Sequence, residues 1–264
     1  MKTLKQFLFV LIILSFTTLS FAAKKQTCEI PPSMKELAKD LAGNSALEDE
    51  FNKSSPDKVK SLGEAWVFFN KRKDKNKTNP KVLTAYVSMT ETLNSSNASN
   101  PAYKGPAASN AFVVDKNGKV FSTKKVHTNI DKGLLKLSNL NNLGVTKPDD
   151  DTYIIVDKDK MMNQIKQRYK DRGINLHPDI EKLIYSYVSK NVGKVLQQRE
   201  VGVPGLHSEV LALNDLYNQV GGAKNIKQGY VQTFHTDGTG HKFPACNNCS
   251  GIIPNSFDIL TGKK

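Results

Sequence analysis

Two short segments in the last third of the chain constrain its fold more than any other feature. Leu206-His207-Ser208-Glu209-Val210 begins one helical pattern, and Pro244-Ala245-Cys246-Asn247-Asn248-Cys249 begins another. Each segment combines metal-binding residue types with the start of a helix, and a predicted strand over residues 229–234 lies between them. If both segments serve one site, the fold must bring two helix N-termini together.

The residue types in these segments are those of a catalytic zinc site. His207, Cys246 and Cys249 give a tetrahedral zinc ion one imidazole and two thiolate ligands, and the fourth position is left open. The C-x-x-C spacing on a first helical turn brings both sulfurs to one ion. Unpaired N–H groups at helix N-termini favour negative charge, which helps to keep the two cysteines ionised. We therefore predict one zinc ion on these three residues.

Glu209 lies two positions after His207, where its carboxylate can reach a water molecule on the ion without being a ligand. An H-x-E segment followed by P-C-x-x-C is the pattern of zinc deaminases of cytosine and adenine, and here one extra residue separates Pro244 from Cys246. In such a site zinc activates the water molecule, and the acid carries protons while ammonia leaves. The pattern predicts hydrolytic deamination of a nucleobase with Glu209 as the proton shuttle.

At these residues the sequence resembles the YwqJ-like deaminases of the cytidine deaminase superfamily. The resemblance covers about residues 106–260 and includes Asn117-Gly118 and Leu176-His177-Pro178 besides the two motif segments. It implies an α/β domain of three layers, with a mixed sheet that carries helices on both faces and zinc between two helix N-termini. Many such deaminases are toxin modules of bacterial secreted proteins. The resemblance therefore implies a toxin-like enzyme, for which an acidic immunity or inhibitor protein is a possible partner.

Two alternatives remain open from the residues alone. A C-x-x-C pair in a secreted protein is often a disulfide, so a binding protein with a structural zinc site or a Cys246–Cys249 disulfide is the main alternative. Glu209 favours the enzyme, because a structural site has no use for an acid beside the ion. A basic extracellular nuclease matches the charge of the chain, but the sequence offers no evident catalytic His/Glu/Arg set.

The other histidines are predicted to have structural or surface positions rather than catalytic roles. His177 precedes Pro178 and is expected to start a helix, and His127 is expected on the surface. His235 and His241 flank the Gly-rich segment 237–240 and are expected in a solvated loop near the site.

The first residues have the pattern of a secretory signal peptide. Lys2 and Lys5 precede an apolar run over residues 7–14, and Ser20-Phe21-Ala22 supplies small residues for cleavage after Ala22. The run is too short to span a membrane, which takes about 20 apolar residues. We predict a secreted protein, periplasmic if the source is Gram-negative, that has no membrane association after cleavage of residues 1–22.

The rest of the chain divides into residues 23–105, a helical region with a linker, and residues 106–264, the deaminase domain. Three helices are expected to begin at Ser33, at Ser55-Pro56-Asp57 and at Asn79-Pro80, and residues 94–109 have the composition of a linker. Beyond it, strands are expected at 111–115, 119–123, 153–156, 229–234 and 257–260, and helices at 131–142, 161–172, 179–198, 207–220 and 246–253. Asn117-Gly118 predicts a hairpin between the first two strands. Alternating strands and helices predict an α/β domain.

The charge of the chain bears on its substrate. The formal net charge is +13, or +11 once Lys2 and Lys5 are removed with the signal. Because a polyanion gains affinity by releasing counterions to Lys and Arg, nucleic acid is favoured over a free nucleoside. Solubility, or binding to an acidic inhibitor, would also explain the charge. Tyr230, Phe234 and Phe243 are candidates to stack on a base, although burial in the core is expected for the first two.

Overall fold

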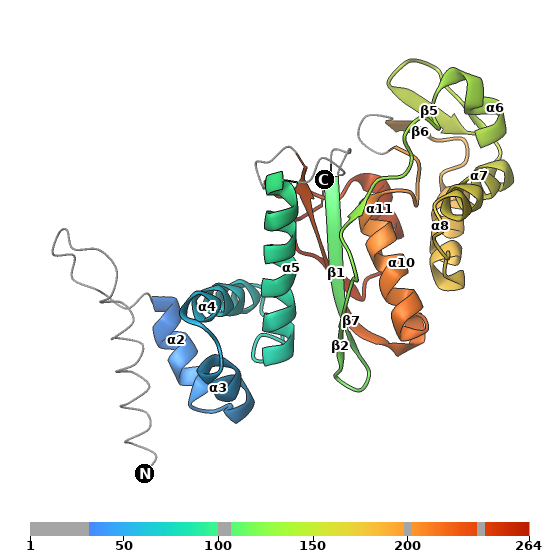
Figure 1. Cartoon of the computed structure of the whole chain (residues 1–264). Coiled ribbons are helices and arrows are strands. Elements are labelled where there is room, and N and C mark those ends of the chain that lie inside the picture. The colour runs from blue at the N-terminus through green and yellow to red at the C-terminus, as the bar shows by residue number, and fades with distance from the viewer. Residues whose placement is uncertain (1–31, 100–106, 198–201, 237–240, 264) are drawn as a thin grey trace, which may run out of the picture. The chain divides into compact units, whose positions relative to one another are not determined.

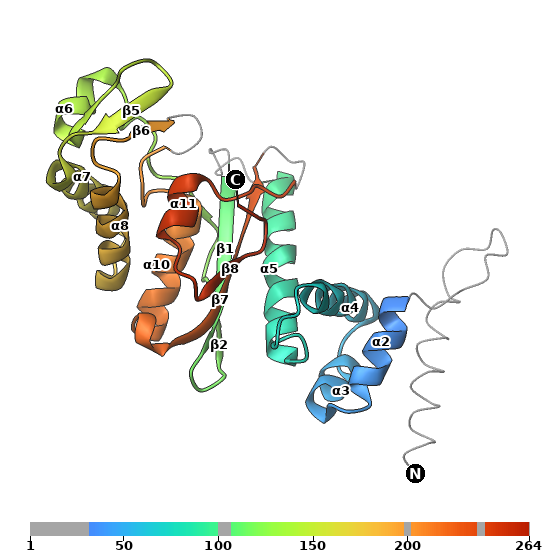
Figure 2. The same cartoon turned by 180° about the vertical axis from the view of Figure 1, so that it is seen from behind.

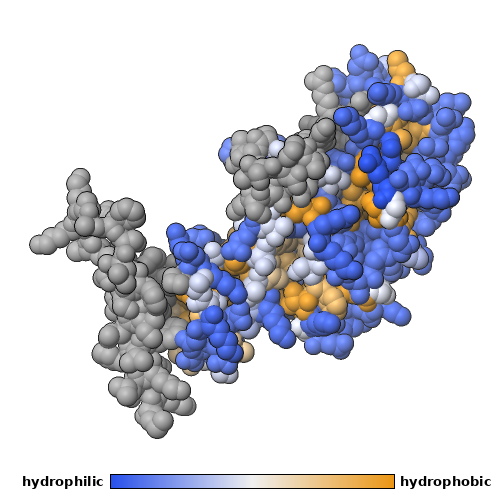
Figure 3. All heavy atoms as spheres, in the orientation of Figure 1, coloured by the Kyte–Doolittle hydropathy of each residue, from blue (hydrophilic) through white to orange (hydrophobic). Residues whose placement is uncertain are grey.

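The computed structural model describes residues 32–99, 107–197, 202–236 and 241–263 (Figures 1 and 2). The predicted signal peptide at 1–22 lies outside these residues. Contacts within the chain divide it between Val87 and Ser88 into two units, which are described separately. Within the described ranges, no helix has the length and apolar character needed to cross a membrane. The face drawn in Figure 3 is mostly hydrophilic, with small apolar areas.

The first unit is built from helices. These are α2 (Pro32–Leu41), α3 (Ser45–Asn52), α4 (Pro56–Lys71) and the first part of α5 (Pro80–Ser99). Asn44 and Ser55 cap α3 and α4 by accepting backbone N–H groups of the first turn. Trp66 is buried, as expected, and its indole N–H donates to Asp40. The three expected helices are confirmed, and α3 was not foreseen.

A mixed sheet forms the centre of the second unit. Its strands are β1 (Ala107–Asp115), β2 (Val120–Ser122), β3 (His127–Thr128), β7 (Ile226–His235) and β8 (Phe257–Ile259). The order is β2-β1-β7-β8, and β3 also pairs with β1. β1 and β7 are antiparallel, whereas β7 and β8 are parallel. Most residues of β1 and β7 are buried, which is expected of strands that are covered on both faces.

Helices cover both faces of this sheet. α10 (Ser208–Val220) packs on one face against β1 and β7. On the other face lies the part of α5 that begins at Ser88, as both views show. There the Asn110 amide donates to the Met89 carbonyl, and Leu93 packs with Ala108 and Phe234. The three-layer α/β fold predicted for this part of the chain is confirmed.

A smaller sheet and the remaining helices extend the α10 side of the second unit. The sheet has the order β4 (Val145–Thr146), β5 (Thr152–Ile155), β6 (Val195–Gln197). The helices are α6 (Leu140–Leu143), α7 (Lys158–Asp171), α8 (Pro178–Lys190) and α11 (Asn247–Ile252), and α8 contacts both α10 and α11. One apolar core joins these elements to the central sheet and includes both motif cysteines: Val113, Tyr153, Ile165, Ile184, Leu213, Cys246, Cys249 and Ile252.

The hairpin after β1 is confirmed and shows why this sequence turns there. Among residues 116–118 only Gly118 has a positive φ, of 78°. The Asp115 carboxylate accepts the N–H groups of Asn117 and Lys119. Such a three-residue loop needs glycine at its last position, because only glycine adopts a positive φ without steric cost.

Three expected elements differ from the structure. Of residues 94–109, expected in a linker, 94–99 continue α5 and 107–109 belong to β1. The helix expected at 131–142 is reduced to a 3-10 turn at Leu137–Asn139 and the short α6, because Gly133 takes a φ of 85° and Asp131 bonds to Val203 instead. The helix expected at 179–198 ends at Lys190, because Gly193 has a positive φ and β6 pairs with β5.

Candidate active site

The structure brings the three predicted metal ligands together at the starts of two helices. His207 is the N-cap of α10 and Cys246 the N-cap of α11, and Cys249 follows in the first turn of α11. The His207 Nδ1 atom lies 3.3 Å from Sγ of Cys246 and 3.5 Å from Sγ of Cys249. All three residues are buried, and their ligand atoms lie within 4.8 Å of one another.

These distances suit a zinc ion. With bonds of about 2.3 Å to sulfur and about 2.0–2.1 Å to nitrogen, a tetrahedral ion separates neighbouring donors by about 3.5–3.8 Å. The observed nitrogen–sulfur distances are close to that range, so a bound ion would need only small shifts. Both thiols are free in the structure, and the residues it describes contain no second group of three metal-binding side chains. The donor set therefore fits zinc.

The ionisable side chains at the site shift one another's pKa values. A hydrogen bond with the Cys249 thiol, and then contact with His207, lower the pKa of Cys246 to about 4. Burial raises the pKa of Cys249 well above its ordinary value. Burial alone would lower the pKa of His207, but hydrogen bonds to Asp131 and Cys246 outweigh it and raise that pKa to about 10. A cation that binds here must displace protons from His207 and Cys249.

Glu209 lies beside the ligands, in the first turn of α10, and is only 3% exposed. Its Oε2 atom is 3.4 Å from Sγ of Cys249 and accepts a hydrogen bond of 3.2 Å from the Ser208 hydroxyl. Burial raises the pKa of the carboxyl above its ordinary value, although the charge of His207 acts in the opposite direction. A raised pKa makes the carboxylate a better proton acceptor, which a proton shuttle requires.

A chain of buried hydroxyl groups leads from the sheet to Glu209. The Ser208 hydroxyl lies 2.7 Å from that of Ser109 on β1, which lies 2.7 Å from that of Thr233 on β7. All three residues have no exposed surface. The sequence analysis missed Ser109 and Thr233, although polar residues inside strands that are otherwise apolar are a signal that could have identified them.

Two segments hold the start of α10 in place. In the loop before His207, the Gly202 carbonyl accepts the hydroxyl of Tyr153 and the amide of Asn248, and the Gly205 carbonyl accepts the hydroxyl of Tyr169. The bond from Asn248 ties this loop to the C-x-x-C segment.

The second segment, residues 129–131, contacts residues 206–208 at the start of α10. Asn129 Oδ1 accepts the Ser208 N–H, Ile130 donates its N–H to the Leu206 carbonyl, and Asp131 contacts His207. Sequence reasoning found none of these contacts.

The other histidines have structural roles. His127, expected on the surface, is buried, and its Nε2 atom lies 3.2 Å from Oδ2 of Asp215 on α10, so that expectation was wrong. His177 caps α8 by accepting the N–H of Asp179, which confirms its role at a helix start. The His235 ring packs edge-on against Phe243. His241 is exposed, and the 237–240 segment between them lies outside the described residues.

The aromatic candidates divide as expected. Tyr230 and Phe234 are buried in the sheet, whereas Phe243 is partly exposed.

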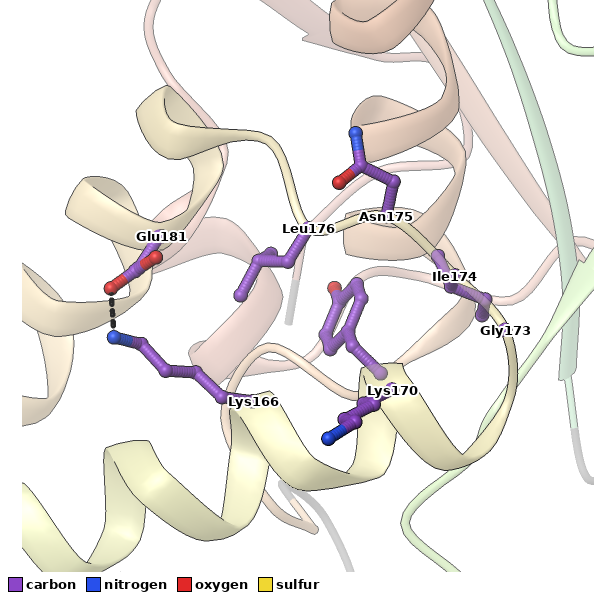
Figure 4. Close-up of a pocket in the computed structure, with 8 residues that line it drawn as sticks. Lys166, Lys170, Gly173, Ile174, Asn175, Leu176 and Glu181 are labelled. Carbon is purple, nitrogen blue, oxygen red and sulfur yellow. Dashed lines mark ion pairs between the residues drawn. The ribbon is translucent and has the colours of Figure 1, made fainter.

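A separate cavity of about 420 Å³ lies where α7 ends and α8 begins (Figure 4). An ion pair between Lys166 and Glu181 crosses it, and none of the four predicted site residues lines it. Tyr169 contributes to its wall while its hydroxyl group holds Gly205. The cavity therefore borders a residue that supports the loop before His207, but it contains none of the candidate metal ligands.

A mixed sheet between helical layers, with one imidazole and two cysteine sulfurs at two helix N-termini and a carboxyl group beside them, defines the class of cytidine-deaminase-like domains. Within that class, residues 134–257 match the YwqJ-like deaminase family, which confirms the resemblance over this stretch. The matched stretch contains His207, Glu209, Cys246 and Cys249, whereas β1 and its hairpin precede it.

One curated relative is a large toxin component. The chain is 34% identical over 116 residues to toxin subunit YenC2 of Yersinia entomophaga. The aligned part is 42% of this chain and 12% of that protein, so the chain spans a small fraction of the relative it matches. No solved structure matches significantly. Together, the family match and this relative support a toxin-type deaminase.

Proposed function

We propose that this protein is a secreted, zinc-dependent deaminase of toxin type that removes the exocyclic amino group of cytosine or adenine. The observation that carries the proposal is the convergence of His207, Cys246 and Cys249 beside the buried Glu209. This convergence lies within the stretch that matches the YwqJ-like deaminases.

The residues have separate roles in this proposal. Nδ1 of His207 and the two cysteine sulfurs would hold zinc, which when bound lowers the pKa of water and so supplies the nucleophile near neutral pH. Glu209 receives a proton from the attacking water on its carboxylate and passes it to the ring nitrogen. It then transfers the second proton to the departing amino group. A carbon–oxygen bond forms, the carbon–nitrogen bond breaks, and one water is consumed for each ammonia released.

The surroundings of Glu209 support this role. Burial raises its pKa, which makes the carboxylate a better proton acceptor, and the Ser208 hydroxyl hydrogen-bonds one carboxylate oxygen. Ser208 is itself held by Ser109 and by the bond of its N–H to Asn129. A carboxylate that is fixed in this way avoids the cost of reorientation during proton transfer.

The substrate proposed here is a base within nucleic acid rather than a free nucleoside. The net charge, +13 for the full chain and +11 without Lys2 and Lys5, favours a polyanion, because each phosphate contact with Lys or Arg releases counterions. The proposal also includes export by the signal at residues 1–22 and an acidic inhibitor protein as a natural partner. Both accord with the toxin name of the relative.

The test compares the wild-type protein with Glu209→Gln, which keeps the size of the side chain and removes the proton shuttle. We expect about one zinc per chain in both proteins and a loss of ammonia release of at least about 10²–10⁴-fold in the variant. Glu181→Gln is the matched control, because Glu181 pairs with Lys166 at the separate cavity. Equal activity of Glu209→Gln and wild type would refute the proposed role. Zinc binding without deamination of any substrate would favour the structural-zinc alternative.

The same assay identifies the substrate class when cytidine, adenosine, single-stranded oligonucleotides and duplexes are compared over a salt series. Turnover of oligonucleotides should fall steeply as salt rises, since counterion release drives their binding. Efficient turnover of free nucleosides that is insensitive to salt, with none on oligonucleotides, would assign the enzyme to free nucleosides instead.

A further inference from the structure

The two nitrogen atoms of His207 face different partners. Nδ1 faces the two cysteine sulfurs, and Nε2 lies 3.3 Å from Oδ2 of Asp131. A neutral imidazole carries one N–H, so a ring that binds a metal through Nδ1 must carry its proton on Nε2. Asp131 is the acceptor in position for that proton.

Asp131 is not a mobile surface acid. Only 19% of its side chain is exposed, and Oδ2 also accepts the backbone N–H of Val203 at 3.2 Å. Its neighbours in the segment 129–131 bond to residues on either side of His207, because Ile130 donates to Leu206 and Asn129 accepts from Ser208. The carboxylate is therefore placed by the backbone around it.

Gly202 gives independent support for a built contact. Its φ is 43°, and a Cβ atom at this position would lie 2.3 Å from Oδ2 of Asp131 and 2.4 Å from Nε2 of His207. No side chain can be added there while these two atoms stay in place. The loop before α10 thus has a glycine where the carboxylate meets the ring.

We propose that Asp131 is a positioning residue of the metal centre, which holds His207 in the tautomer and orientation that present Nδ1 to the ion. This inference rests on the zinc site of the proposed function, but not on deamination. Carboxylates that accept the second N–H of a histidine ligand fix its tautomer and make the ring a stronger donor, and their loss typically weakens metal binding about 10–100-fold.

The test measures zinc affinity of the full chain by competition with a chromophoric chelator, so it needs no substrate. Asp131→Ala removes the acceptor and should weaken zinc binding about 10–100-fold, and Asp131→Asn, which keeps an acceptor oxygen but loses the charge, should weaken it less. The matched controls are Asp215→Ala and Asp215→Asn, which break the His127–Asp215 pair on α10. The zinc affinity of these variants should stay within about twofold of the wild-type value, because the His127–Asp215 pair contacts none of the proposed ligands.

A second readout separates positioning from general loss of structure. Cobalt in place of zinc gives visible absorption bands that report the geometry of the ligands, and these bands should change in the Asp131 variants and not in the Asp215 variants. If Asp131→Ala fails to fold, the nearly isosteric Asp131→Asn decides the question by its affinity and spectrum. If the Asp131 variants have the zinc affinity and cobalt spectrum of the wild type, the inference about Asp131 is overturned and the proposed function still stands. Absence of zinc binding by the wild-type protein would overturn the proposed function as well.

Discussion

Replacement of Ser109 by alanine tests the hydroxyl chain that leads to Glu209. The Ser109 hydroxyl makes two hydrogen bonds of 2.7 Å, to Ser208 and to Thr233, and all three residues are fully buried. Two such bonds contribute about 0.5–1.5 kcal/mol each, and a buried hydroxyl that loses its partner costs about 1–3 kcal/mol. We therefore expect Ser109→Ala to lower the free energy of unfolding of the second unit by about 2–4 kcal/mol.

The measurement must report on the second unit. The single tryptophan, Trp66, belongs to the first unit, so its fluorescence is unsuitable. Hydrogen exchange of peptides that cover β1 and β7, followed by mass spectrometry, measures the opening free energy where the substitution lies. Ser122→Ala, at an exposed serine of β2, is the control and should change the value by no more than about 0.5 kcal/mol.

A double-mutant cycle with Thr233→Val makes the test sharper. Valine has nearly the shape of threonine without the hydroxyl, so the variant removes the other end of the 2.7 Å bond. Because each single variant breaks the same bond, the double variant should cost less than the sum of the two by about 1 kcal/mol or more. Additive effects, or a loss below about 0.5 kcal/mol for Ser109→Ala, would show that the chain of hydroxyls does not stabilise this site.

Two further predictions concern stability. Asp215→Asn removes a carboxylate that bonds His127 and the Lys124 N–H, and should cost about 1–3 kcal/mol at neutral pH. Despite burial, these bonds hold the pKa of Asp215 below its ordinary value, so the contribution is present above the unfolded pKa and should fade in urea titrations as pH falls through the folded one. A fragment that begins at Ala107 tests the proposed domain boundary: it should bind zinc, yet resist urea less than one that begins at Ser88, because it lacks the buried Leu93. Failure of the shorter fragment to fold would move the boundary into α5.

The parts of the site that sequence predicted are those with local causes. The starts of α10 and α11 follow from short segments with apolar spacing, so the sequence predicted where His207, Glu209, Cys246 and Cys249 lie at these helices. Asp131, Ser109 and Thr233 were missed, because each acts through a partner far away in the sequence. Ser109, for example, lies 99 residues from Ser208. A local sequence pattern does not predict such a contact.

Contacts between distant segments also explain where the predicted elements differ from the structure. The helix expected to reach residue 198 ends early because β6 pairs with β5, a contact between distant segments that overrides helical periodicity. The burial of His127 likewise depends on Asp215 of α10, which lies 88 residues away. Residues 94–99 were assigned to a linker for their Asn and Ser content, and yet they continue α5.

The order of the candidate ligands along the chain has a consequence for the unfolded protein. Cys249 follows His207 by 42 residues, and the intervening chain contains all of α10 and all of β7. An ion that joins these ligands is a reversible cross-link, which closes a loop around the strand at the centre of the sheet. If such a cross-link acts as a disulfide does, closing a loop of this length lowers the conformational entropy of the unfolded chain, which destabilises the unfolded state by about 4 kcal/mol. Metal bound by these residues would then raise the free energy of unfolding through the unfolded state, by up to about this amount.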